Sequence, residues 1–307
     1  MRPALARTIW HHVEAINAVA YFSPESGEAA AGLGLKGFWM GYFGFRAAPL
    51  GQLGSAVVEA TFFNFHPDRV RRAIPDAWRY TSPGEILAVR SPAAAASLRR
   101  ILTEPDAERL AAHALPPLRD VVRSASPCGR PLFAANRDVE APPDPVAALW
   151  QAATTLREHR GDGHVASLTW ADLDGCEAHA LFAACATIPP HTFWQSRGWT
   201  ADDWEGAVER LKFRRLLARD GTPTASGSEL HEQIETRTDE LALRAYEAIG
   251  SDTCRQLLGY LEPAARRMTA EIPFPNPIGL PTSGDGDGDG DGDGDGDGDH
   301  GGDERSL

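Results

Sequence analysis

The densest group of chemically active side chains lies at residues 157–164, where six ionisable residues and two glycines fill eight positions. Its two arginines can bind a carboxylate or a phosphate through paired hydrogen bonds. Its two histidines titrate near neutral pH, and a neighbouring carboxylate can orient either imidazole for acid–base chemistry. This pattern predicts a polar pocket that binds a ligand or performs catalysis. The residues are Arg157, Glu158, His159, Arg160, Gly161, Asp162, Gly163 and His164.

A structural interpretation of the same cluster stays open, because charges at helix ends often pair across turns and between helices. Metal binding is not expected, since His159 and His164 are five residues apart and the spacing that places two ligands on one helical face is four. We predict neither a metal nor a cofactor, and no catalytic residue is assigned.

Arg46 lies among aromatic residues ahead of Pro49, where it can anchor an anion or form a structural salt bridge. The aromatic residues at positions 38, 39, 43, 45, 62, 63 and 65 are expected to form core first and pocket lining second. The predicted ligand-binding residues are Arg46, Arg157, Glu158, His159, Arg160, Asp162 and His164.

Helices are expected to position these side chains. Residues 4–21 and 146–159 carry apolar side chains at helical spacing, and the glycines at 161 and 163 are expected to end the second helix. Three prolines within residues 138–145 indicate a boundary. We therefore expect a helical domain at 1–140, a winged helix-turn-helix domain with a docked Pro-rich segment at 141–283, and a disordered Gly-Asp tail at 284–307.

Residues 189–247 predict a helix-turn-helix unit. A short helix at 189–195 is followed by a turn that contains Gly198, and Thr200 with Asp203 forms a capping-box pattern for the next helix. The segment 216–224, with Gly221 at its tip, is expected to form a short β-hairpin wing. The fold class is thus mainly α, with a helical N-terminal body and a winged helix-turn-helix unit.

The order helix, turn, helix, hairpin, "Thr-x-x-Gly", helix resembles the MarR-like winged-helix proteins. Four further blocks, at residues 39–43, 46–51, 156–164 and 273–280, are similar to a family of actinobacterial helix-turn-helix proteins. That resemblance covers about residues 4–281 and implies no established activity. The MarR-like resemblance implies a homodimer paired through its long helices.

The charge of the second motif helix argues against simple DNA binding. Its beginning, which in such proteins lies nearest the bases, carries Asp202, Asp203, Glu205 and Glu209, and carboxylates are repelled by phosphate. Acids at the start of a helix and bases at its end also complement the helix dipole, which explains both ends without DNA. The candidate DNA-binding residues are Arg197, Arg210, Lys212, Arg214, Arg215 and Arg219.

Composition sets few limits on function. The net charge of −13 comes mostly from residues 284–307, which hold nine Asp and one Glu against one Arg. The four cysteines show no CxxC pair, no signal peptide or membrane span is visible, and a cytoplasmic protein with free thiols is expected. The common nucleotide-binding and hydrolase motifs are absent, so an enzyme is less expected than a binding protein.

Three hypotheses follow. The leading one is a homodimeric transcriptional regulator that binds double-stranded DNA and senses a small ligand in its helical half. The alternative is a ligand-binding or catalytic protein that uses the winged helix as a scaffold, with a polar pocket around residues 157–164. The third is a protein–protein adaptor.

Overall fold

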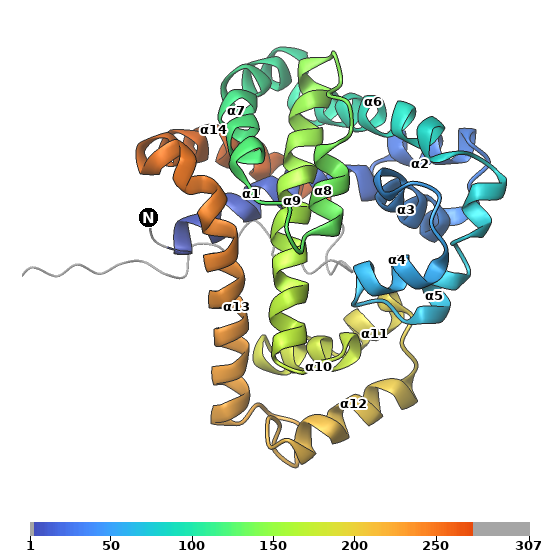
Figure 1. The fold of residues 1–307 in the computed structure, drawn as a ribbon, viewed down its shortest axis with the longest axis vertical. Helices are drawn as coiled ribbons and strands as arrows, with labels where there is room; N and C mark the ends of the chain where they lie inside the picture. Colours follow the sequence, from blue (N-terminus) through green and yellow to red (C-terminus); the bar gives the residue numbers. More distant parts are fainter. Residues whose placement is uncertain (1–2, 273–307) are drawn as a thin grey trace, which may run out of the picture.

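The computed structural model describes residues 3–272, which fold almost entirely as helix (Figure 1). The predicted docking of a Pro-rich segment beyond Ile272 and the predicted disorder of 284–307 lie outside the described residues. In chain order the helices are α1 (Pro3–Phe22), α2 (Pro24–Gly32), α3 (Gly37–Ala47), η1 (Ala48–Leu50), α4 (Ser55–Phe62), α5 (Pro67–Arg71), η2 (Asp76–Arg79), α6 (Pro83–Leu102), α7 (Glu104–Ser124), α8 (Pro131–Arg137), α9 (Pro145–Trp170), α10 (Gly175–Cys185), α11 (His191–Arg197), α12 (Ala201–Phe213), α13 (Ala225–Tyr246), η3 (Glu247–Ile249) and α14 (Gly250–Ala270).

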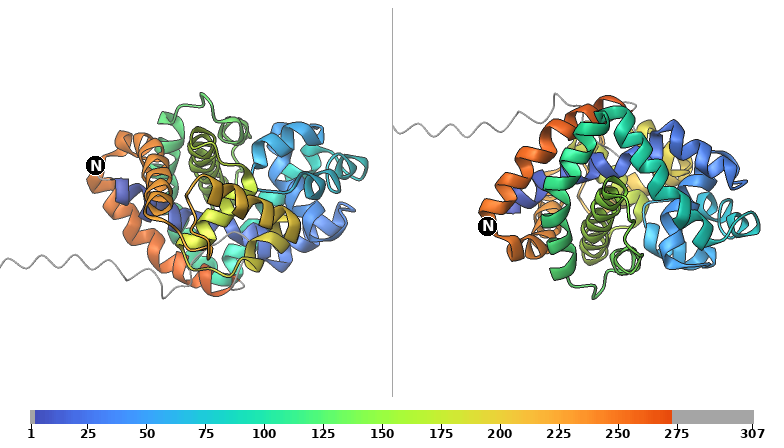
Figure 2. Two further views of the ribbon diagram at one scale, coloured as in Figure 1. Left: turned by 90° about the horizontal axis from the view of Figure 1, so that it is seen from below. Right: turned by 90° about the horizontal axis from the view of Figure 1, so that it is seen from above.

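Helix α9 forms the axis of the molecule. It packs against α1, α6, α7, α8 and α13, so apolar and polar side chains on all its faces are buried. The largest core joins residues of α1, α6, α7, α9, α13 and α14, and Figure 2 shows these helices grouped around α9. This core contains residues from both sides of position 140, and the predicted division of the chain into domains stays a prediction.

Two smaller cores flank α9. An aromatic core that includes Phe43, Phe62 and Phe65 holds α3, α4 and α5 together on one side of α9. A third core holds α10, α11 and α12, together with the start of α13, at the lower end of the molecule in Figure 1. The helix-turn-helix unit therefore lies at one extremity of the fold.

The predicted β-hairpin wing is wrong. Within residues 3–272 no strand forms, and the 216–224 segment makes a single isolated antiparallel bridge between Leu217 and Pro223. Pro223 has no amide hydrogen to extend a ladder. The Asp220 carboxylate instead accepts hydrogen bonds from the amide and hydroxyl of Thr222, which closes the tip as a tight turn.

The expected helix break at residues 161–163 is also wrong, because α9 continues to Trp170. Gly163 serves close packing instead: a Cβ there would lie 2.8 Å from Nη1 of Arg130. The eight cluster residues therefore sit on one continuous helix, and the helical rotation points them toward different neighbours.

Candidate functional site

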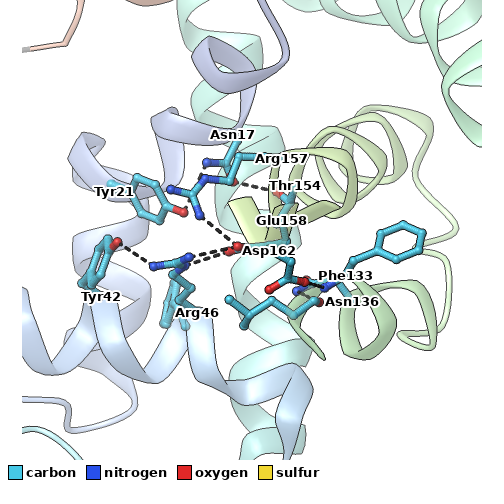
Figure 3. A network of polar contacts seen from close by, with 12 residues as sticks. Asn17, Tyr21, Tyr42, Arg46, Phe133, Asn136, Thr154, Arg157, Glu158 and Asp162 are labelled. Atoms are coloured by element: carbon cyan, nitrogen blue, oxygen red, sulfur yellow. Dashed lines mark hydrogen bonds and ion pairs between the residues drawn. The ribbon is translucent and has the colours of Figure 1, made fainter. Parts of the chain in front are cut away.

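The first part of the cluster is a buried ion network between α1, α3 and α9 (Figure 3). Arg46 on α3 binds Glu158 through two hydrogen bonds, Nε to Oε1 at 2.7 Å and Nη2 to Oε2 at 2.9 Å. Arg157 donates to Glu158 at 2.9 Å and, through Nε, to Glu14 on α1 at 3.1 Å. Two arginines and two glutamates thus join three helices in the interior.

The network decides the protonation of its carboxylates. Burial by itself raises the pKa of Glu158, but Arg157 and Arg46 outweigh burial and hold the pKa at about 2. Burial raises the pKa of Glu14 despite the nearby Arg157. Glu158 is therefore the firmly ionised partner of both guanidinium groups.

The second part of the cluster faces α13. Arg160 pairs with Asp239 at 2.9 Å and with Glu235 at 3.1 Å, and its guanidinium lies over the ring of Trp10 at 4.1 Å. Nδ1 of His164 lies 3.1 Å from the hydroxyl of Thr238, which is also on α13. These contacts join α9 to α13 and α1.

The third part faces α8. The carboxylate of Asp162 accepts a hydrogen bond from the amide of Phe133 at 2.9 Å, near the start of α8. Burial raises the pKa of Asp162 to about 7 despite that hydrogen bond. The ring of His159 packs edge-on against Phe133, and Arg130 donates to the carbonyl oxygen of His159.

The predicted ligand residues are therefore divided. The structure brings Arg46 together with Arg157 and Glu158. Arg160 and His164 of α9 form a second group that contacts α13, and His159 and Asp162 form a third that contacts α8. All seven side chains are engaged in packing or polar contacts.

His159 predicts a pH dependence of stability. Burial, followed by the charge of Arg130, lowers its pKa to about 3. Because the unfolded chain then takes up the proton first, the stabilisation is complete above about pH 6.5 and is lost as the pH falls, by about 2 kcal/mol at pH 5 for this group. We expect His159→Gln to show a smaller loss between pH 7 and pH 5 than the wild type in urea unfolding. An equal loss in both proteins would contradict this, and His191→Gln, at an exposed position, is the control.

A cavity lies beside the buried ion network of Arg46, Arg157 and Glu158, and the residues at 157–164 do not predict it. It measures about 350 Å³ between the end of α1 and helices α2 and α3, and it is lined by residues that include Tyr21, Ala30, Phe38, Tyr42 and Phe45. The Gly-rich aromatic run at residues 32–43 supplies much of this lining. Small residues keep α2 and α3 from filling the space.

Two small hollows adjoin the cavity and share Tyr21 with it. One is lined by Trp39, Phe65 and Arg197, and the other by Arg46 and Glu158 with other residues. The hydroxyl of Tyr21 accepts a hydrogen bond from Asn17 at 3.2 Å, and that of Tyr42 accepts one from Arg46 at 3.4 Å. The tyrosines therefore connect the cavity wall to the buried ion network.

The helix-turn-helix unit is formed by α11 and α12, supported by α10. Gly198, with φ of 87°, ends α11 in the left-handed conformation that glycine adopts without strain. Thr200 and Asp203 form the expected capping box at the start of α12. Trp204, Ala207 and Leu211 bury the inner face of α12.

The turn of this unit is packed against the N-terminal half of the chain. The amide of His66 donates to the carbonyl of Arg197 at 3.0 Å, and the indole of Trp199 donates to the carbonyl of Asn64 at 3.2 Å. Nε2 of His66 lies 3.7 Å from the Asp203 carboxylate. The loop between α4 and α5 thus covers the turn and the beginning of α12.

A helix-turn-helix family matches residues 6–275. The chain belongs to this helix-turn-helix family. Comparison with curated proteins and with solved structures returned no match. The helix-turn-helix part of the resemblance seen in the sequence is confirmed, whereas its MarR-like and actinobacterial parts stay predictions.

In this helix-turn-helix protein, the first two of the six predicted DNA-binding residues contact other segments of the chain. Arg197 is half-buried, with its guanidinium 4.5 Å from the centre of the Phe65 ring. Arg210 pairs with Asp174 at 2.6 Å and with Glu177 at 2.7 Å, both at the beginning of α10.

The other four predicted residues lie at or after the end of α12. Arg214 donates to two carbonyl oxygens at the end of α9, and Lys212 pairs with Glu209 at 3.0 Å. Arg215 and Arg219 are exposed. Of the six, these last two are the exposed arginines that form no ion pair among the described residues.

The outer face of α12 is acidic. Asp202, Glu205 and Glu209 are exposed along this face, and Phe213 at its end is 90% exposed. In the helix-turn-helix proteins that bind DNA, the second helix enters the major groove beside two phosphate backbones. The acidic face of α12 opposes such an approach.

Among residues 3–272, no group of three or more His, Cys, Asp or Glu side chains is placed to hold a metal ion. In the same part of the chain, no helix is long and apolar enough to cross a membrane.

Proposed function

We propose that this helix-turn-helix protein binds a small organic ligand in the cavity between α1, α2 and α3. We further propose that the helix-turn-helix unit responds to the bound ligand through a change in its packing. The observation that carries the proposal is the cavity of about 350 Å³. Ligand sites are typically clefts of about 300–1,000 Å³ with mainly apolar walls and a few polar groups.

The surroundings of the cavity fit this role. Phe38 is 45% exposed, whereas Tyr42 and Phe45 are buried, so the lining extends from the surface to the interior. The small hollow beside the cavity reaches the helix-turn-helix unit, because it is lined by Trp39 of α3, by Phe65 and by Arg197 of α11. The guanidinium of Arg197 lies 4.5 Å from the centre of the Phe65 ring. A ligand that orders α3 would thereby change the packing of α11.

The charge of α12 favours ligand binding over DNA binding as the primary activity. Affinity for DNA depends on arginines and lysines that neutralise phosphates, and binding of this kind weakens when carboxylates face the backbone. Here three of the four exposed charged side chains of α12 are acidic, and Arg210 and Arg214 are held by contacts with α10 and with the end of α9.

The test uses N-phenyl-1-naphthylamine, a neutral apolar probe that fluoresces in apolar sites, and two glycine substitutions. Gly27 lines the cavity, and a Cβ added there would meet nothing within 4 Å. Gly27→Leu is expected to fill part of the cavity and to weaken probe binding at least about tenfold, the equivalent of about 1.4 kcal/mol. Gly259→Leu on α14, which also has nothing within 4 Å, is the matched control and should bind like the wild type.

Absence of saturable probe binding to the wild type would reject the proposal. Equal binding by Gly27→Leu and the wild type would place the probe elsewhere and would reject it as well.

Double-stranded DNA is the second candidate partner, favoured by membership of a helix-turn-helix family and by the exposed Arg215 and Arg219. A homodimer paired through α13 would present two such units. Under this proposal the wild type binds a genomic fragment with strong salt dependence, and Arg215→Ala with Arg219→Ala removes about two units of the salt slope. No binding above background at low salt would reject it.

A further inference from the structure

The junction of α1, α3, α6, α9 and α11 contains more buried positive than negative charge. Arg46 and Arg157 are balanced by Glu14 and Glu158. Two further arginines, Arg90 on α6 and Arg197 on α11, form no ion pair with a carboxylate of the described residues.

Arg90 is 2% exposed and forms no ion pair with a carboxylate of the described residues. Its guanidinium donates to the carbonyl of Phe45 at 2.9 Å, to Asn136 at 3.1 Å and to Gln151 at 2.9 Å, which are all neutral acceptors. Its Nε is buried without a hydrogen-bond partner among the described residues. These contacts hold the guanidinium in place, but none of the groups that accept its hydrogen bonds is charged.

Arg197 lines the hollow next to the cavity, together with Tyr21, Phe38, Trp39 and Tyr42. Its Nε is also buried without a hydrogen-bond partner among the described residues. Burial lowers the pKa of Arg197 to about 10, so the side chain stays charged at neutral pH.

An uncompensated buried guanidinium is unfavourable, and a carboxylate or sulfonate that accepts its hydrogen bonds removes much of the penalty. The cavity offers such an anion an apolar place for the rest of the molecule. Because Arg197 belongs to α11, an anion bound to it would also contact the turn of the helix-turn-helix unit.

We infer that the ligand is an apolar organic anion, an aromatic or aliphatic acid whose charged group binds Arg197 while its apolar part fills the cavity between α2 and α3. This inference rests on the proposed function and specifies the class of ligand for the same site.

The experiment compares two probes that share an anilinonaphthalene frame and differ in charge. 1-Anilinonaphthalene-8-sulfonate is an anion, and N-phenyl-1-naphthylamine is neutral. We expect the full-length wild type to bind the anion more tightly. Arg197→Gln is expected to weaken the anion about tenfold to hundredfold, since a hydrogen bond to a charged group contributes about 1.5–3 kcal/mol, and to change binding of the neutral probe less than about threefold. Arg219→Gln removes an exposed arginine and should leave both affinities unchanged.

The results of this experiment distinguish a wrong ligand class from a wrong ligand site. If the neutral probe binds in a Gly27-dependent manner but the anion binds no more tightly, the ligand site stands and the inference of an anion is wrong. If neither probe binds, the ligand site is rejected together with the inference. Should Arg197→Gln fail to fold by circular dichroism, the two wild-type affinities still decide, because an anion that binds no better than the neutral probe contradicts the inference.

Discussion

Replacement of Glu158 by alanine is expected to lower the free energy of unfolding by about 3–5 kcal/mol, because it leaves Arg46 and Arg157 buried without their shared partner. The carboxylate side chain is 1% exposed, and Arg46 is 10% exposed, so water cannot readily solvate the charges that remain. Urea unfolding of the two proteins at pH 7, followed by circular dichroism, measures the difference.

A second arginine–glutamate pair provides the control. Arg71 binds Glu59 through two hydrogen bonds of 2.9 Å, a geometry close to that of Arg46 and Glu158, but the Arg71 side chain is 56% exposed. Glu59→Ala is expected to change stability by at most about 1 kcal/mol. Equal effects of the two substitutions would show that burial does not determine the strength of the Glu158 network.

Replacement of Gly175 by alanine is expected to destabilise the protein by about 3 kcal/mol, near the upper end for overpacking. A Cβ at this position, the first residue of α10, would lie 2.2 Å from the carbonyl oxygen of Phe63. The obstacle is backbone, which cannot rotate away as a side chain can. Either the α4–α5 loop or α10 must move, and the contact between the N-terminal half and the helix-turn-helix unit is lost first.

The matched control for Gly175→Ala is Gly206→Ala in α12. There the nearest atom to an added Cβ is Nη1 of Arg210 at 3.5 Å, which is an ordinary contact. Alanine inside a helix is favoured over glycine by about 0.5–1 kcal/mol, so this variant should be neutral or more stable. Thermal unfolding compares both with the wild type, and an unaffected Gly175→Ala would contradict the close packing of Phe63 on α10.

Local signals in the sequence predicted local structure well. The Thr200 and Asp203 pattern predicted the capping box, and Gly198 predicted the turn of the helix-turn-helix unit. Thr224 likewise caps α13 through the amide of Gly227, at the "Thr-x-x-Gly" pattern. In each case the residues that interact lie within a few positions of one another.

The buried ion network at Glu158 is formed by residues that are far apart in the sequence, so no local sequence pattern predicts it. Glu158 and Arg46 are separated by 112 positions, and Arg157 and Glu14 by 143, so their pairing follows from the packing of α1, α3 and α9. The glycines at 161 and 163 were expected to break α9, but packing on all sides of the helix outweighs their low helix propensity. The cluster at 157–164 was thus visible in the sequence, whereas its division among three neighbours was not.

The cavity could be predicted only in part. The sequence marked the aromatic run on α3 and its small neighbours, but whether such residues fill a space or leave one open depends on the approach of α2 to α3. The sequence around Arg90 does not predict that this residue is buried, because its hydrogen-bond acceptors Asn136 and Gln151 belong to the distant helices α8 and α9.

Hydrogen–deuterium exchange of the full-length protein, with and without saturating N-phenyl-1-naphthylamine, tests the central claim most directly. A ligand in the cavity is expected to slow exchange of the amides of residues 24–47, which form α2 and α3, with a smaller effect at residues 191–200, where α11 meets α3 through Arg197 and Phe65. Saturable binding that protects neither α2 nor α3, or that protects α12 alone, would contradict a ligand site in the N-terminal half.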